Sequence, residues 1–147
     1  MKKLILFLIL IFIYWSAKKQ QPEEVSLNAN DAQTLDNLLI FHNLERERLD
    51  LPELQLDFNL ISYAQNHAEW MSRKNSLTHS NLKNVIWFQR SGENIAWNQA
   101  DEQAVLSAWM NSQGHRNNIL NRKFSHVGFG IARNSKNQIY WCTVFGG

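Results

Sequence analysis

The sequence predicts a single domain of the α+β class. Helical patterns come first along the chain and strand patterns come last, an order that favours separate helices and strands over alternating βαβ units. The 147 residues are 44% hydrophobic and include 6 Trp, 8 Phe and 3 Tyr, which is enough apolar surface for a buried core. A single Cys excludes an internal disulfide framework and a zinc site built from several cysteines.

The amino terminus has the order of an export signal. Lys2 and Lys3 precede an unbroken apolar run over residues 4–15, which is shorter than the ~20 residues of a membrane-spanning helix. Residues 1–17 are therefore predicted to be a cleaved signal peptide. Because the bulky Trp15 stands where a small residue is preferred before cleavage, an uncleaved amino-terminal anchor is the alternative.

This signal sets the expected location and the domain boundaries. The protein is expected to be secreted, extracellular or periplasmic, and to contact a membrane only through an uncleaved amino-terminal segment. Residues 18–34 are predicted to be a polar linker, and residues 35–147 to be the folded domain. The net charge of +2 is too small to indicate a nucleic-acid partner.

Two long helices are predicted at the start of the domain. The first begins at a cap formed by Asn28 or Asn30 and runs to about Leu49. The second begins at a cap formed by Asp57 and runs to about Asn75. Both carry apolar residues at helical spacing, so each is expected to bury one face.

A loop and a third helix follow. Residues 77–92 are predicted to be mostly loop, with a short strand at residues 85–88 as an option. The third helix opens near Ala100 and ends at Gly114, a residue suited to the left-handed position after a helix. Residues 117–120 are predicted to add a brief helical turn.

Two strands end the domain. Residues 127–132 and 138–145 are rich in β-branched and aromatic side chains and are joined by the polar residues 133–137, a pattern that predicts a hairpin. The residues predicted to contribute to the core between helices and sheet are Leu106, Trp109, Phe124, Phe129 and Trp141.

Two histidines and one carboxylate are candidates for a functional site. His79 and His115 each follow a predicted helix, and Glu93 lies on a third segment predicted to be irregular, where functional side chains concentrate. Together they could hold a zinc ion with water in the open position, or act as acid and base. Spacing alone favours the simpler interpretation, in which these side chains hydrogen-bond the loops together.

The remaining histidines and the cysteine carry weaker signals. His42 and His67 lie on predicted helices and are expected to be partly buried or surface residues. For His126, beside the first strand, a place at the rim of a cleft is the less favoured alternative. Cys142 is expected to be a small buried hydrophobic residue rather than a nucleophile.

Seven short motifs occur in a fixed order over residues 35–146. They are His42-Asn43-x-x-Arg46, Leu54-x-x-Asp57-x-x-Leu60 followed by Ala64 and Ala68, His79-Ser80, Gly92-Glu93-Asn94-Ile95, Trp109-x-x-Ser112-x-Gly114-His115-Arg116-x-Asn118-Ile119-Leu120, Phe124-x-x-Val127-Gly128-x-Gly130 and Tyr140-Trp141-x-x-x-Phe145-Gly146. The ordered set closely resembles the CAP superfamily of cysteine-rich secretory proteins, antigen 5 and plant pathogenesis-related group one proteins, in its bacterial SCP-like single-domain form.

The resemblance implies a fold and a site. The fold is an α-β-α sandwich with a small antiparallel sheet between helical layers, in a secreted protein. The site is a cleft lined by two His and two Glu, and metal binding at the His pair is known in some members. His79, Glu93 and His115 match three of these positions, whereas the second Glu falls on Ser112. The family's disulfides are absent.

These observations lead to an expected function and two alternatives. The expected function is a secreted, non-enzymatic binding module whose cleft, formed by His79, Glu93, Ser112 and His115, holds a divalent metal or a small ligand. The metal would be zinc, bound by His79 and His115, with Glu93 as a third ligand or as a group that orients an imidazole. The partner would be a small ligand or an envelope component. The alternatives are a metal-assisted or acid–base hydrolase acting on peptide or cell-envelope material, and a purely structural envelope domain.

Overall fold

The computed structural model describes residues 29–147 apart from Ile86. The predicted export signal, the first part of the predicted linker and a cap at Asn28 lie outside these residues. The elements are α2 (Ala29–Glu47), β1 (Gln55–Leu56), α3 (Phe58–Lys74), the 3₁₀ helix η1 (Leu82–Asn84), β2 (Ser91–Trp97), α4 (Glu102–Met110), α5 (Gln113–Ile119), β3 (His126–Arg133) and β4 (Ile139–Gly146). Within this part of the chain, no helix combines the length and the apolar character needed to cross a membrane.

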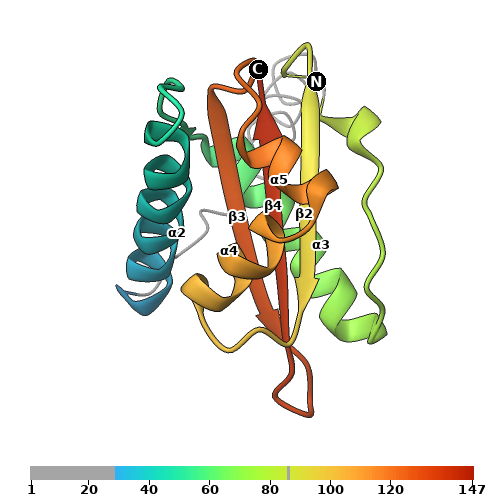
Figure 1. The fold of residues 1–147 in the computed structure, drawn as a ribbon. Coiled ribbons are helices and arrows are strands. Elements are labelled where there is room, and N and C mark those ends of the chain that lie inside the picture. The colour runs from blue at the N-terminus through green and yellow to red at the C-terminus, as the bar shows by residue number, and fades with distance from the viewer. Residues whose placement is uncertain (1–28, 86) are drawn as a thin grey trace, which may run out of the picture.

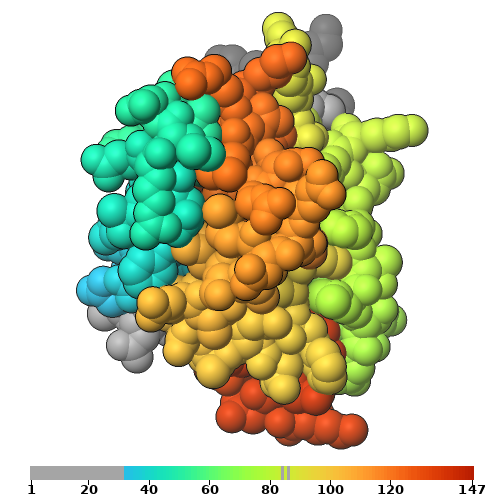
Figure 2. Space-filling view, in the orientation of Figure 1, coloured from blue at the N-terminus to red at the C-terminus, as the bar shows by residue number. Residues whose placement is uncertain are grey.

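A four-stranded sheet separates two helical layers. Its strand order is β1-β3-β4-β2, so that β2 is an edge strand. Helix α3 covers one face of the sheet, and α2, α4 and α5 cover the other (Figure 1). On the second face, α4 and α5 lie between α2 and the segment that follows α3 (Figure 2). The predicted α+β sandwich is therefore confirmed.

The sheet is mixed, and this corrects the antiparallel sheet that the resemblance implied. Strand β4 pairs antiparallel with both β2 and β3. The two-residue strand β1 pairs parallel with β3, with Gln55 opposite His126 and Leu56 opposite Val127. Strand β1 could not be predicted from the sequence, because two residues are too few to show an alternating pattern.

Two glycines of β3 bring α3 close to the sheet. A Cβ atom added to Gly128 would lie 2.1 Å from the carbonyl carbon of Leu60, and one added to Gly130 would lie 2.3 Å from that of Ala64. The helix backbone therefore rests directly on the strand at these positions, with the small Ala64 and Ala68 buried beneath it. This close contact fixes the position of α3 and of the segment that follows it.

A buried arginine joins the end of α2 to the loop before β3. The Arg46 guanidinium donates hydrogen bonds to the backbone oxygens of Pro52, Ile119, Asn121 and Phe124, at 2.8 to 3.0 Å. Burial, and secondarily the charge of Arg122, lower the pKa of Arg46. These carbonyl acceptors satisfy four of the five guanidinium N–H groups, and among the residues that the structure describes no carboxylate forms an ion pair with this cation.

One helix has the ends that were predicted from the sequence, and another does not. Helix α3 has Asp57 as its N-cap, as predicted, and the Asp57 side chain accepts from Leu60 N–H. The helix ends at Lys74, close to the predicted end, and the structure adds that its C-cap Asn75 is left-handed. Gly114 was predicted to end the third helix, but α4 ends at Met110 and Gly114 lies inside α5 without a positive φ. The predicted single helix is two helices in the structure, because the helical backbone is interrupted at Asn111 and Ser112 and a new helix begins at Gln113.

The segment before the hairpin also differs from the prediction. The optional strand at residues 85–88 does not form at the described residues of that range, where a turn follows η1. A strand forms instead at Ser91–Trp97, where loop was predicted for its first residues. This strand depends on pairing with β4, since Gly92, Glu93 and Asn94 have weak intrinsic β propensity. The hairpin itself is confirmed, as are all the predicted core residues.

Candidate functional site

Glu93 lies in the middle of the edge strand β2, not on irregular backbone as the sequence predicted. Residues alternate between the two faces of a strand, so Glu93 and Ile95 share the face that α3 covers. The side chain of Glu93 is only 2% exposed. A buried carboxylate needs hydrogen-bond donors, and its surroundings supply them.

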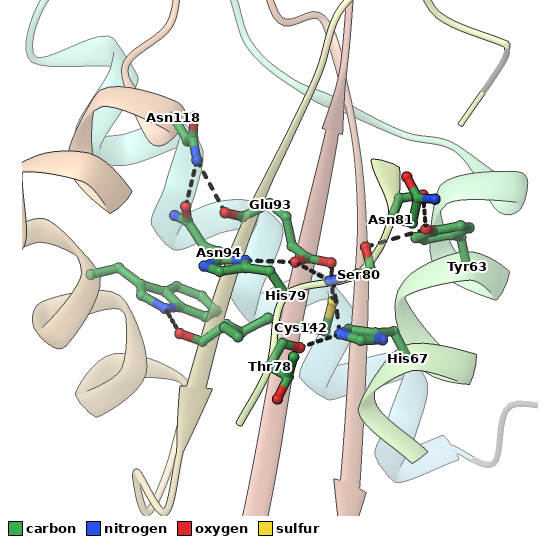
Figure 3. Close-up of polar contacts among 12 residues, drawn as sticks. Tyr63, His67, Thr78, His79, Ser80, Asn81, Glu93, Asn94, Asn118 and Cys142 are labelled. Atoms are coloured by element: carbon green, nitrogen blue, oxygen red, sulfur yellow. Dashed lines mark hydrogen bonds and ion pairs between the residues drawn. The ribbon is translucent and has the colours of Figure 1, made fainter. Parts of the chain in front are cut away.

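The carboxylate of Glu93 gathers groups from three elements (Figure 3). Its Oε1 accepts from His79 Nδ1 at 2.7 Å and from the Ser80 backbone N–H at 2.9 Å, both on the segment after α3. Its Oε2 lies 3.8 Å from the Cys142 thiol on β4 and 4.0 Å from His67 Nε2 on α3. Glu93 therefore holds the His79 segment against the sheet.

His67 belongs to this cluster, although its place on a helix predicted only a partly buried or surface residue. Its Nε2 donates to the Thr78 backbone oxygen at 2.7 Å, and its ring stacks on Trp70 with an interplanar angle of 10°. The available signal was helical spacing, which places His67 beside the buried stripe that contains Ala64 and Ala68. That spacing does not show that Glu93, from a distant strand, lies opposite.

His115 lies in α5, and this corrects the prediction that it follows a helix on irregular backbone. Asn94 Nδ2 donates to the His115 backbone oxygen at 3.0 Å, and Asn118 Nδ2 donates to Asn94 Oδ1 at 2.9 Å. Asn118 Nδ2 also lies 3.1 Å from the Glu93 backbone oxygen, so these amides attach α5 to β2. Burial, and secondarily the nearby charge of His79, lower the pKa of His115.

His79 and His115 thus lie on opposite sides of β2, near enough for the charge of His79 to act on His115. His79 comes from the side of α3, with its imidazole 61% exposed, and His115 comes from the side of α5. Ser112 is the N-cap residue of α5, and its hydroxyl makes no capping hydrogen bond. Among residues 29–147 without Ile86, no group of three or more His, Cys, Asp and Glu side chains is arranged to hold one metal ion.

The hydrogen bond between His79 and Glu93 determines what His79 can do. When Nδ1–H donates to the carboxylate, Nε2 carries the free lone pair of the neutral imidazole. That nitrogen is available as a metal ligand or a proton acceptor. Two imidazole nitrogens are donors that borderline divalent ions such as zinc accept, so the residues fit such an ion. Two roles were predicted for Glu93, and its contact with His79 Nδ1 is the one expected of a group that orients the imidazole.

The other titratable residues lie apart from this arrangement or contribute to packing. His42 is completely buried against the rings of Trp109, Phe129 and Phe145, more deeply than predicted. Burial lowers the pKa of His42 to about 4.

Cys142 and His126 are the remaining residues for which a position was predicted from the sequence. Cys142 is buried, as predicted, and burial together with the charge of Glu93 raises the pKa of its thiol, so it stays protonated. His126 Nδ1 contacts the Ser125 hydroxyl at 2.8 Å, and its ring packs on Phe88.

Comparisons with known proteins place this fold and this chain in context. The model of the family described as "CAP: Cysteine-rich secretory protein family" matches residues 39–145. The chain is 39% identical over 98 residues to the uncharacterized protein YkwD of Bacillus subtilis, covering 60% of this chain and 38% of YkwD. The chain therefore spans well under half of the length of that relative.

Two solved structures show the same fold. An extracellular protein containing an SCP domain from Bacillus anthracis aligns with a TM-score of 0.67 and 27% identity, over 82% of this chain and 44% of that one. The structure described as NaASP2 with Zn²⁺ aligns with a TM-score of 0.66 and 14% identity, over 86% of this chain and 84% of that one.

Proposed function

Because the chain belongs to the cysteine-rich secretory protein (CAP) family, we propose that it is a secreted binding module in which His79 and His115 hold a divalent metal ion or a small ligand without turnover. The observation that carries the proposal is the 2.7 Å contact between His79 Nδ1 and the buried carboxylate of Glu93. The zinc in the description of NaASP2 is consistent with the proposal, although the likeness to that protein is one of fold.

Each residue has a distinct part in the proposed site. Glu93 fixes the tautomer and the orientation of His79, which leaves Nε2 free. His115 supplies the second imidazole, and burial favours its neutral form, which is the form that binds a metal. A bound zinc ion would supply a Lewis acid with open positions for water or for an anionic ligand group.

Binding without turnover is favoured over hydrolysis by how Glu93 is used. A hydrolase needs a nucleophile or activated water together with a poised base. Glu93 already accepts from His79 and from Ser80, so it orients the imidazole and is not free to act as a second base. Ser112, at the position of the family's second Glu, carries a hydroxyl that does not titrate near neutral pH.

Calorimetric titration of the full chain in mild detergent with zinc tests the proposal. We expect modest affinity, which the change His79→Ala or His115→Ala removes and His126→Ala leaves unchanged. Ser112→Glu is expected to tighten binding by adding a carboxylate. Affinity should weaken as the pH falls, because protons compete with the metal for imidazole nitrogen and only neutral imidazole is a ligand. Equal zinc affinity in the wild type and the double alanine variant would contradict the proposal.

The location is tested separately. We expect cell fractionation to find the protein outside the cytoplasm, and intact mass of the exported form to distinguish cleavage near Ala17 from an uncleaved anchor. A mostly cytosolic protein would overturn the secreted part of the proposal while leaving the metal titration unaffected.

A further inference from the structure

One asparagine side chain fixes the orientation of two other amides at the tip of the hairpin between β3 and β4, the lower end of the sheet in Figure 1. Asn134 Oδ1 accepts from the backbone N–H groups of Lys136 and Gln138 at 3.0 and 2.9 Å. Its other end is therefore the NH₂ group, and Nδ2 donates to Asn75 Oδ1 at 2.7 Å and to Gln138 Oε1 at 2.8 Å. The oxygens of Asn75 and Gln138 are thus in use, and their NH₂ groups remain available.

Both of these amide residues line a pocket that the hairpin tip forms with residues at the ends of α3 and β2. The volume of the pocket is about 370 Å³, which is within the range of sites for small ligands. None of the lining residues in the described part of the chain is acidic. The lining residues are Asn75, Leu77, Trp97, Lys136, Gln138 and Tyr140.

The polar side chains of this pocket offer hydrogen-bond donors. Among the residues that the structure describes, the NH₂ groups of Asn75 and Gln138 meet no acceptor, and the Lys136 ammonium forms no ion pair. Tyr140 is 3% exposed, and its hydroxyl has no hydrogen-bond partner in the same part of the chain. Polar groups of largely buried residues are normally bonded, so these groups are suited to an acceptor that a ligand brings. One ammonium without a carboxylate beside it fits a single negative charge.

The pocket also has exposed apolar walls. Trp97 is 45% exposed and Leu77 is 50% exposed, so both side chains offer apolar surface that no other part of the described chain covers. Covering such surface is favourable, and an indole ring in particular attracts another ring in an offset or edge-on arrangement. A ligand with an apolar ring beside its negative charge can therefore satisfy both parts of the pocket at once.

We propose that this pocket binds a small carboxylic acid whose carboxylate stands next to an apolar ring. The two carboxylate oxygens accept from the NH₂ groups of Asn75 and Gln138, and the Lys136 ammonium balances the single charge. Trp97 and Leu77 pack against the ring. A phosphate group fits less well, because it carries up to about two charges and no arginine is among the described lining residues.

NMR titration of the ¹⁵N-labelled full chain with matched probes tests the inference, in mild detergent with EDTA so that no metal contributes. N-acetyl-L-phenylalanine carries both groups, N-acetyl-L-phenylalaninamide lacks the charge, and acetate lacks the ring. We expect the first probe to shift the side-chain NH₂ signals of Asn75 and Gln138 in a saturable way. The other two should bind about tenfold more weakly or less, as for loss of a hydrogen bond to a charged group or of the ring contact.

Two outcomes of this titration would overturn the inference. One is the absence of shifts at these NH₂ signals with the first probe, and the other is equal affinity for the acid and its neutral amide. The carboxyl end of a peptide has the same chemistry as the free acid, so a tripeptide that ends in phenylalanine is a further probe. Tighter binding of the tripeptide would assign the pocket to a peptide end and reject the free acid.

Two substitutions of nearly unchanged shape reverse the donors. Asn75→Asp and Gln138→Glu each keep an oxygen that accepts from Asn134 Nδ2 and replace the NH₂ group by a charged oxygen. We expect the double variant to bind N-acetyl-L-phenylalanine at least about tenfold more weakly and to bind the cation 2-phenylethylamine more tightly than the wild type does. An unchanged midpoint of thermal unfolding shows that the fold is kept. Equal affinity of the wild type and the double variant for the acid would contradict the inference.

A lysine variant and a histidine variant complete the test. Lys136→Met should weaken binding of the acid about threefold, as for an exposed ion pair, whereas Lys123→Met, at an exposed lysine outside the pocket, should not. The inference goes beyond the proposed function, because neither His79 nor His115 lines this pocket. His79→Ala should therefore leave the affinity for the acid unchanged. If it removed that affinity, the acid would bind at the histidines, and the inference would fail while the zinc titration kept its meaning.

Discussion

His79 Nδ1 lies 2.7 Å from Glu93 Oε1, although 14 positions separate the two residues in the chain. The carboxylate is 2% exposed and the imidazole is 61% exposed, so a buried acceptor holds a side chain that faces solvent. The Ser80 N–H binds the same oxygen and fixes the carboxylate from the neighbouring backbone position.

The first prediction concerns this carboxylate. Glu93→Gln removes the negative charge and replaces one acceptor oxygen by an NH₂ donor, so the amide holds the His79 imidazole less firmly in the orientation that leaves Nε2 free. We expect zinc affinity to fall about 10- to 100-fold, as for other outer-shell changes, with little change in the midpoint of thermal unfolding. Isothermal titration calorimetry measures the affinity, and Glu69→Gln, at an exposed pair with Arg73, is the control. Unchanged affinity would show that Glu93 does not act through His79.

The second prediction concerns stability against pH. The folded-state pKa of His42, about 4, lies below the ordinary value of 6.5, so the unfolded chain takes up the proton first. The stability due to neutral His42 is present above pH 6.5 and is lost as the pH falls toward 4, by about 2 kcal/mol between pH 7 and pH 5. Urea unfolding at several pH values measures this. In His42→Leu, most of the slope in that window should disappear.

The third prediction concerns the core. Trp109 is 1% exposed, packs against His42 and donates its indole N–H to Ile95. Trp109→Ala should lower the free energy of unfolding by ~3–5 kcal/mol, as for other large core truncations. Trp87, which is 52% exposed, provides the matched control, and Trp87→Ala should change stability by less than about 0.5 kcal/mol. A loss below about 1 kcal/mol for Trp109→Ala would contradict its place in the core.

The fourth prediction uses two glycines with opposite surroundings. An added Cβ at Gly128 would lie 2.1 Å from the backbone of Leu60, whereas one at Gly114 would meet nothing within 4 Å. Gly128→Ala should therefore destabilise the protein by about 2 kcal/mol or more through overpacking. Gly114→Ala, inside α5, should stabilise it by roughly 0.5–1 kcal/mol. Equal denaturant midpoints for the two variants would show that α3 does not rest on β3 as described.

Much of the fold could be predicted from local patterns. The Asp57 cap, the helix that follows it and the terminal hairpin follow from capping preferences and from the spacing of apolar residues. These signals depend on neighbours within a few positions, so a single sequence contains them. Strand β2 was partly missed because its residues are held by pairing with β4, a partner that lies far along the chain.

The candidate site shows the same division. The positions of His79, Glu93 and His115 as candidates followed from the sequence and from the ordered motifs of the family. The part of His67 did not, because its approach to Glu93 depends on how α3 packs on the sheet.

The sequence by itself determined the fold class, the export pattern and the residue types available for chemistry, because composition, helix caps and strand alternation act over short distances. Only the tertiary structure decided which of these residues meet. The contact of α3 with Gly128 and Gly130 sets how close the helix lies to the sheet, and this short distance brings His67 toward Glu93. The physical reason is that a buried carboxylate is stable only where several distant donors converge on it, and such convergence arises from packing.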